Sequence, residues 1–149
     1  MNQPQTLDHA GIAARVPHSG SMCLLSRLVA WTPERIACSA TSHRDTSNPL
    51  RLAGALPAVT AIEYASQAMA LHGTLSAAPG SEPVPGFLAA VRGVRQHVAR
   101  LDDLPGELSV TATKLLGDAR QAQYQFQLAD EAGRVLVEGR ATVILNALP

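Results

Sequence analysis

The sequence predicts an α+β fold, one domain over residues 1–149, in which an antiparallel sheet wraps around one long central helix. The segment 57–73 is apolar or small on almost every side of a helix, so it is expected inside the protein. In the segment 121–129 apolar residues alternate with glutamines, which is typical of a strand with one wet face. Strand-like runs precede and follow the helix, and together these observations indicate the fold class.

The N-terminal half is divided by turn and cap residues. Thr6 is expected to cap a short helix over 6–14, which Pro17 ends. A hairpin is predicted at 32–35 because a Thr-Pro pair separates two apolar strands. The predicted strands are 22–31 and 36–43, and a loop over 44–56 then leads to Pro57 in the first turn of the central helix.

The C-terminal half reads as a surface connection followed by strands. Ala, Pro, Gly and Ser dominate residues 76–85, which is typical of a connection. Turn residues then separate the strand-like runs, which are 86–100, 107–116, 121–129 and 135–145. This order of two strands, one buried helix and several long antiparallel strands is that of the hotdog fold.

Composition excludes several classes of function. Twelve basic residues balance twelve acidic ones, and only five residues are aromatic, so neither nucleic acid nor an anionic membrane is an expected partner. No signal-peptide pattern and no membrane-length apolar run is found, so a cytoplasmic location is expected. Cys23 and Cys38 lie in apolar segments without metal-ligand spacing and are expected to be buried free thiols.

Glu63 is the strongest functional candidate. It is the one carboxylate in the apolar helix, and a buried carboxylate is costly unless it finds a partner or shifts its pKa. A purely structural alternative stays open, in which Glu63 hydrogen-bonds Gln67 one turn later or caps a neighbouring loop.

Three ordered motifs resemble the bacterial 3-hydroxyacyl-[acyl-carrier-protein] dehydratases of the hotdog superfamily, and most closely the branch from aryl polyene and xanthomonadin-type pigment pathways. The first motif, VPHSGSMCLL at 16–25, looks like the start of the family's first strand. The second is LP at 56–57 followed by IEYASQA at 62–68, which resembles the family's helix. The third, PGFL at 85–88 with VR at 91–92, is similar to the strand after that helix.

The resemblance implies a hydro-lyase that dehydrates 3-hydroxyacyl thioesters, carried by an acyl-carrier protein, in fatty-acid or polyene synthesis. Neither a cofactor nor a metal is implied. The expected assembly is a homo- or heterodimer with a hotdog subunit, because a loop His and a helix acid usually come from opposite subunits. A neutral imidazole suits removal of the α-proton, and an acid protonates the leaving hydroxyl.

Mapped onto this sequence, Glu63 matches the helix acid, the amide of Ala58 matches the oxyanion donor, and Gln67 belongs to the same motif as a substrate-binding candidate. The position of the loop His falls at Asn48, whose amide is expected to bind the substrate hydroxyl or to cap the loop. His43 is the expected replacement base.

Other assignments remain open. His18 of the first motif is a second candidate base, and either histidine has a structural alternative in which it binds backbone. The chain is also compatible with a non-catalytic hotdog subunit that pairs with an active dehydratase and donates Glu63 to a composite site. A third alternative is an acyl thioesterase in which Glu63 activates water.

Overall fold

The computed structural model describes residues 3–18, 20–77 and 86–145. The helices are α1 (His9–Ala13) and α2 (Ala61–Leu75), with the single 3₁₀ turns η1 (Gly20–Met22), η2 (Ser42–Arg44) and η3 (Ala58–Thr60). The strands are β1 (Arg27–Thr32), β2 (Arg35–Ala40), β3 (Gly86–Gln96), β4 (Leu108–Gly117), β5 (Gln121–Ala129) and β6 (Val135–Leu145).

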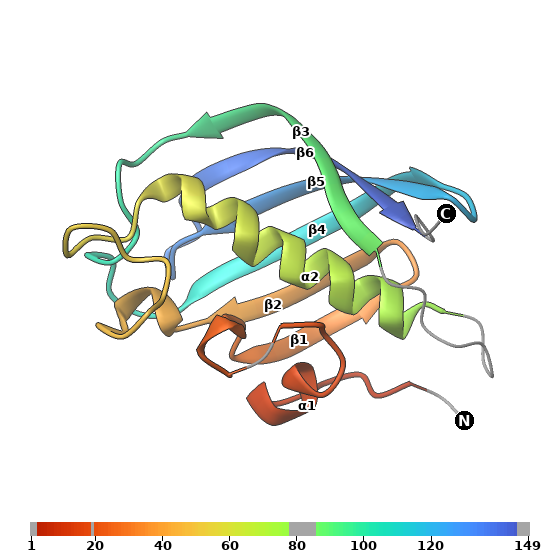
Figure 1. Cartoon of the computed structure of the whole chain (residues 1–149), viewed down its shortest axis with the longest axis horizontal. Coiled ribbons are helices and arrows are strands. Elements are labelled where there is room, and N and C mark those ends of the chain that lie inside the picture. The colour runs from red at the N-terminus through yellow and green to blue at the C-terminus, as the bar shows by residue number, and fades with distance from the viewer. Residues whose placement is uncertain (1–2, 19, 78–85, 146–149) are drawn as a thin grey trace.

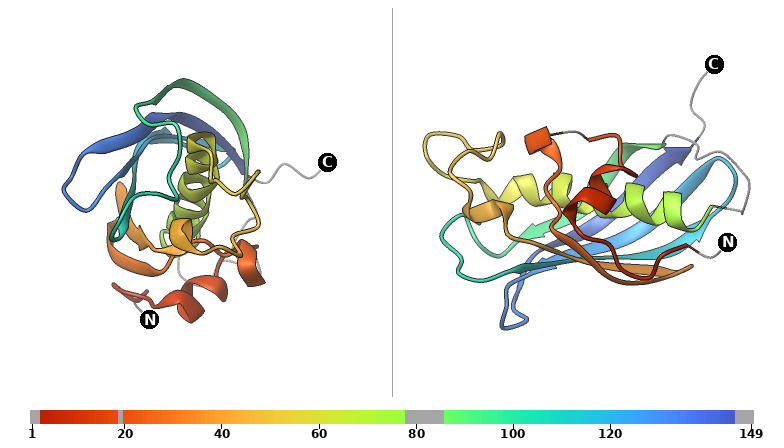
Figure 2. Two further views of the ribbon diagram at one scale, coloured as in Figure 1. Left: turned by 90° about the vertical axis from the view of Figure 1, so that its left-hand side faces the viewer. Right: turned by 90° about the horizontal axis from the view of Figure 1, so that it is seen from below.

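All six strands form one antiparallel sheet in the order β1-β2-β4-β5-β6-β3, and α2 lies along its concave face (Figure 1). Viewed along the helix, the sheet curls around α2 from β1 to β3 (Figure 2). This arrangement confirms the predicted α+β hotdog fold. The bounds of β5 and β6 coincide with the predicted runs at 121–129 and 135–145.

Helix α2 forms the core together with the inward-facing residues of the sheet. Pro57 directly precedes η3, and the chain continues from this 3₁₀ turn into α2, so the regular α-helix begins later than the sequence predicted and extends to Leu75. Ala61, Ala65 and Ala68 are fully buried, and their small side chains let the helix lie close to the strands.

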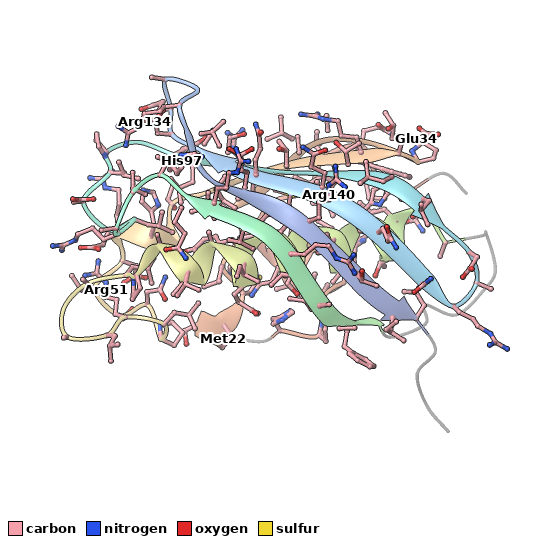
Figure 3. The ribbon with its side chains drawn as sticks, turned by 90° about the horizontal axis from the view of Figure 1, so that it is seen from above. Met22, Glu34, Arg51, His97, Arg134 and Arg140 are labelled. Atoms are coloured by element: carbon pink, nitrogen blue, oxygen red, sulfur yellow. The ribbon has the colours of Figure 1, made fainter. Side chains whose placement is uncertain are left out.

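The strands show the period of two that the sequence predicted. On β5, Tyr124, Phe126 and Leu128 are buried, whereas Gln125 and Gln127 are exposed. The outer face of the sheet is polar and charged, as the side chains around Arg140 show (Figure 3). One face of the sheet therefore packs on α2 and the other faces water.

The two edges of the sheet differ. The backbone of Leu7 pairs with Leu28 of β1 through two hydrogen bonds of 2.9 and 3.5 Å, and the Trp31 indole donates to the Pro4 carbonyl at 2.8 Å, so the N-terminal segment covers the β1 edge. Strand β3 pairs only with β6 among the described strands, and it carries exposed Phe87 and Val91. The β3 edge is thus a long open template for another strand.

Several local expectations change. Asp8 caps α1 instead of Thr6, because its carboxylate accepts the Gly11 amide at 2.8 Å. The second strand ends at Ala40, so His43 belongs to η2 and not to a strand end. The predicted connection at 76–85 falls mostly on residues 78–85, outside the described part of the chain.

Cys23 and Cys38 are buried free thiols, as predicted. Burial raises the pKa of Cys23 above its ordinary value and raises the pKa of Cys38 to about 12. Each thiol is therefore expected to stay protonated and unreactive at neutral pH.

No helix in the described part of the chain has the length and apolar character that are needed to span a membrane.

His72 is a fully buried structural histidine on α2. Its Nε2–H donates to the Thr32 carbonyl at 2.8 Å, and its Nδ1 accepts from the Tyr124 hydroxyl at 2.8 Å. Burial lowers the pKa of His72 below its ordinary value of 6.5, and burial lowers the pKa of His43 in the same way.

This burial predicts a loss of stability in mild acid. Between the lowered folded pKa values and 6.5, the unfolded chain binds more protons than the folded chain, so the free energy of unfolding falls as the pH drops through this window. Urea unfolding at about pH 7.5 and about pH 5.5 is the measurement, with a slope of up to about 1.4 kcal/mol per pH unit for each histidine.

His72→Gln removes one of the two titrating groups and is expected to flatten that slope, even if it lowers stability at neutral pH. His97→Gln, on the exposed end of the sheet, controls for replacing a histidine. An unchanged slope in His72→Gln would contradict the assignment.

Candidate active site

Glu63 lies in the first turn of α2 and is held through one of its two carboxylate oxygens. His18 Nε2 lies 2.9 Å from Glu63 Oε1, and Gln67 Nε2 donates to the same oxygen at 3.3 Å. The side chain is 32% exposed, so it is half-buried and not mostly buried as its apolar helix suggested. The structure therefore gives Glu63 both the Gln67 contact of the structural alternative and a histidine partner.

His18 reaches Glu63 from the loop between α1 and η1. Its side chain is 22% exposed, and its Nδ1 atom is buried without a hydrogen-bond partner among the described residues. Because Nε2 lies against the carboxylate and Nδ1 is buried, the ring is suited to holding Glu63, and it also lines the groove beside that residue.

Gln67 fastens this loop to the helix. Its Nε2 donates to the Met22 carbonyl at 2.6 Å, and its Oε1 accepts the Leu24 amide at 2.8 Å. The side chain is fully buried, and both ends of its amide are used by the protein. Gln67 is therefore a positioning residue, and the structure differs here from the expected role in substrate binding.

A groove runs beside Glu63 along one face of α2, with a volume of about 810 Å³. We call it the α2 groove. It exists because the helix presents small residues at intervals of three or four positions. These residues are Ser66, Ala70, Gly73 and Thr74, and the opposite wall comes from β3, β5 and β6 with Leu88, Tyr124, Val143 and Leu145.

Asn48 lies outside the lining of the α2 groove. Its Nδ2 donates to the Ser42 carbonyl at 2.9 Å and to the Tyr64 hydroxyl at 3.1 Å, and its Oδ1 accepts the Leu50 amide at 2.9 Å. These contacts match the alternative in which Asn48 caps its loop. The amide has no free donor left for a substrate hydroxyl in this conformation.

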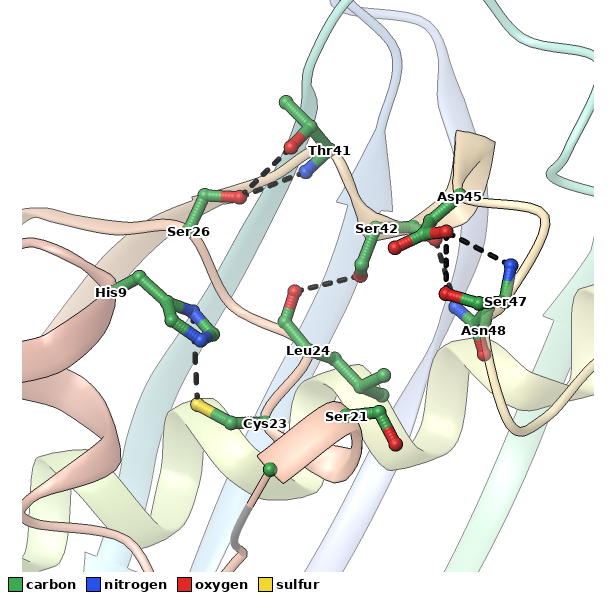
Figure 4. Close-up of a pocket in the computed structure, with 11 residues that line it drawn as sticks. His9, Ser21, Cys23, Leu24, Ser26, Thr41, Ser42, Asp45, Ser47 and Asn48 are labelled. Atoms are coloured by element: carbon green, nitrogen blue, oxygen red, sulfur yellow. Dashed lines mark hydrogen bonds between the residues drawn. The ribbon is translucent and has the colours of Figure 1, made fainter.

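Asn48 instead borders a second cavity of about 360 Å³ (Figure 4). Hydroxyl groups dominate this cavity, and several of them bind protein atoms, as Ser42 Oγ does by donating to the Leu24 carbonyl at 2.7 Å. The lining also includes His9, Ser21, Cys23, Ser26, Thr41, Asp45 and Ser47. Asn48 and Glu63 of one chain therefore line different cavities.

His43 and the Ala58 amide are placed differently from what the sequence predicted. His43 is fully buried, its Nε2 donates to the Leu104 carbonyl at 3.0 Å, and it does not line the α2 groove. The Ala58 amide donates to the Ala99 carbonyl at 3.0 Å, so this N–H is not free to stabilise an oxyanion here. Among the described residues, His18 is the histidine that partners Glu63.

The arrangement is suited to proton transfer at Glu63 Oε2. Both contacts described above go to Oε1, which fixes the carboxyl group and leaves the second oxygen without a hydrogen bond among the described residues. No group of three or more His, Cys, Asp and Glu side chains in this part of the chain is placed to hold a metal ion. The chemistry available to these residues is general acid or general base catalysis.

Comparisons with known proteins point to one family and one fold. The model of the ApeP-like family, described as ApeP dehydratase, matches residues 10–147. The dehydratase heterocomplex ApeI:P from Xenorhabdus doucetiae contains a chain with a TM-score of 0.80 and 25% identity, and the match covers 90% of each chain. No curated protein sequence matches this one.

More distant structures share the fold. A thioesterase from Haemophilus influenzae has a TM-score of 0.67 and 15% identity, over 97% of this chain and 94% of the other. A hypothetical thioesterase from Streptococcus pneumoniae, solved with coenzyme A, has a TM-score of 0.59 and 11% identity, over 79% and 83% of the two chains.

The role of Gln67 predicts a large effect of its replacement by leucine. Gln67→Leu leaves the Met22 carbonyl and the Leu24 amide unpaired, and each buried unpaired group costs about 1–3 kcal/mol. Urea unfolding is expected to show a loss of about 2–6 kcal/mol. The same change at exposed Gln127 is the control and is expected to stay within about 0.5 kcal/mol. Equal effects at both positions would contradict this role.

Proposed function

The chain belongs to the ApeP-like dehydratase family, and we propose that it is the hotdog subunit that supplies the acid Glu63 to a composite dehydratase site. The substrate is a 3-hydroxyacyl thioester on an acyl-carrier protein, in fatty-acid or polyene synthesis. The other half of the site comes from a second hotdog subunit. The observation that carries the proposal is the His18–Glu63 pair, 2.9 Å apart, at the wall of the α2 groove.

In the proposed reaction, a base removes the α-proton of the thioester and Glu63 Oε2 gives a proton to the 3-hydroxyl. The C–O bond breaks, water leaves, and a 2-enoyl thioester remains. His18 and Gln67 hold Oε1, so only Oε2 exchanges the proton. After product release, the proton taken by the base returns to Glu63 through solvent, which balances the cycle.

The base is assigned to the second subunit because, among residues 3–18, 20–77 and 86–145, no suitable group is placed for the role. His43 is tied to the Leu104 carbonyl away from the groove, Asn48 is not basic, and the free nitrogen of His18 is buried. A site with an acid and without a base fits a subunit that completes a partner's site.

The open β3 edge is the proposed contact with that subunit. It adjoins the groove, since Phe87 and Leu88 of β3 line the α2 groove, and no other described strand than β6 pairs with β3. Pairing across this edge covers Val91 and brings a second hotdog subunit next to the groove. The assembly named in the ApeI:P heterocomplex supports a heterodimer.

A thioesterase is the second candidate, because a carboxylate with one free oxygen also activates water for hydrolysis. The two reactions give different products from the same 3-hydroxyacyl carrier. Dehydration lowers the mass of the carrier-bound acyl group by one water, whereas hydrolysis releases the free acid. Mass spectrometry of the carrier therefore separates them.

Glu63→Gln tests the acid directly. The chain is incubated with a 3-hydroxyacyl carrier, alone and with a candidate hotdog partner from its gene neighbourhood. Dehydration is expected only with the partner, and Glu63→Gln is expected to slow it by about 10²–10⁴-fold because proton donation is lost.

Glu138→Gln is the matched control. Glu138 also pairs with a histidine, His97, at 2.9 Å, but this pair does not line the α2 groove. It is expected to keep the wild-type rate. Full activity of Glu63→Gln, or release of the free hydroxy acid instead of the enoyl product, would refute the proposal.

Val91→Asp tests the proposed contact. A charge on the open β3 edge is expected to weaken dimerisation by at least about tenfold, measured by sedimentation equilibrium with the partner. Val29→Asp, on β1 at the opposite edge, is the control, since Val29 is similarly exposed at 47% against 36%. Loss of assembly in Val29→Asp but not in Val91→Asp would place the contact elsewhere.

A further inference from the structure

Lys114 is the only lysine of the chain, and it faces the concave side of the sheet. On β4 it stands directly opposite Tyr124 of β5, whose side chain is buried against α2, so both side chains lie on the same face. Lys114 is half-buried and lines the α2 groove. The described hydrogen bonds and ion pairs include none made by its ammonium group.

An inward-facing lysine is unusual at this place in the sheet. Charged residues that protect a sheet from aggregation belong on edge strands, and β4 is an interior strand between β2 and β5. Gly117 also gives the lysine room, since a Cβ atom there would lie 2.6 Å from Lys114 Cε. Edge protection therefore does not account for the side chain, and Gly117 leaves the space that its inward orientation needs.

Lys114 lies at the opposite end of the groove from Glu63. It sits beside His72 and Tyr124, and His72 comes nine residues after Glu63 on α2, which is about 14 Å along the helix axis. The Tyr124 hydroxyl already donates to His72. The Arg15 guanidinium also lines the groove and donates to the Gly11 carbonyl at 3.0 Å, so Lys114 is the cation that the sheet contributes to this end. Between the two ends the groove is lined mainly by small and apolar residues, among them Ala70, Met69 and Val143.

We propose that Lys114 selects acyl chains whose distal end carries an oxygen that accepts a hydrogen bond, such as a hydroxyl or a carboxylate. This specificity rests on the proposed function of the groove as the acyl site. An alkyl end would displace water from the Lys114 ammonium group without offering a hydrogen-bond acceptor, and this desolvation costs free energy. An oxygen at the end of the acyl chain replaces the displaced water as the acceptor. The groove thus matches a substrate that is a thioester at one end, apolar in the middle and polar at the tip.

Binding of unreactive ligands tests this selection without catalysis. The ligands are acyl-pantetheine thioethers of one chain length, which can be neither hydrolysed nor dehydrated, with a methyl, hydroxyl or carboxylate end. Isothermal titration calorimetry of the full chain is expected to give a dissociation constant about tenfold lower for at least one oxygen-ended ligand than for the methyl-ended ligand. The hydroxyl and carboxylate arms decide which oxygen group is preferred.

Because the chain has a single lysine, its ¹³Cε–¹H signals in ¹³C-lysine-labelled protein report on one site. The oxygen-ended ligand is expected to shift these signals more than the methyl-ended ligand does. Lys114→Met is expected to reduce the affinity ratio to about twofold or less, and Lys114→Arg is expected to retain it. Arg140→Met removes a charge from the exposed outer face and is the matched control.

The result is independent of turnover. Glu63→Gln is expected to keep the preference for the oxygen end, since the two groups act at opposite ends of the groove. A clear preference in a protein that never dehydrates its substrate would refute the proposed function and leave the role of Lys114 standing. Equal binding of all ligands, no binding of any, or a preference that survives Lys114→Met would overturn the role of Lys114.

Discussion

The buried amide of Gln67 is the interaction on which the candidate site depends. It binds the backbone at Met22 and Leu24, and its Nε2 also contacts Glu63. The segment that carries His18 is thereby fastened to the helix that carries Glu63. Without this link the histidine and the carboxylate have no covalent or secondary-structure reason to meet, since one lies in a loop and the other in α2. The hydrogen bonds of Gln67 thus help to set the position of His18 relative to Glu63.

One side of helix α2 packs into the core, and another side lines the α2 groove. Its alanines and Tyr64 pack into the sheet, whereas small residues on another face leave the α2 groove unfilled. An unfilled groove gives up packing that a close-fitting core would have, and an ammonium and a carboxylate at its ends add desolvation cost. Residues that lower the stability of the fold in this way fit a role in ligand binding. They line the α2 groove, which includes both Glu63 and Lys114.

Much of the fold was predictable because its periodic signals are strong. The apolar helix and the glutamine alternation on β5 fixed the architecture, and β5 and β6 have the predicted bounds. Local polar contacts were less predictable. Asp8 caps α1 although Thr6 was an equally suitable residue type, and His43 turns to the Leu104 carbonyl because η2 ends the strand early.

For the site, the sequence identified Glu63 but not the whole of its environment. His18 was only the second candidate base, and its pairing with Glu63 depends on tertiary packing that no local pattern encodes. Ala58 and Asn48 are occupied by backbone partners, which only the loop conformation reveals. One signal was available in the composition: Lys114 is the only lysine of the chain, and it stands in a strand where an apolar residue fits the period of two.

The most direct measurement of the central claim is a crystal structure of the chain assembled with a hotdog partner and an unreactive 3-hydroxyacyl-pantetheine analogue. We expect Glu63 Oε2 to lie within about 2.6–3.2 Å of the 3-hydroxyl oxygen, His18 and Gln67 to remain on Oε1, and a base of the partner subunit to face the α-carbon. A complex in which the 3-hydroxyl contacts another acid, with Glu63 turned away from the acyl chain, would contradict it.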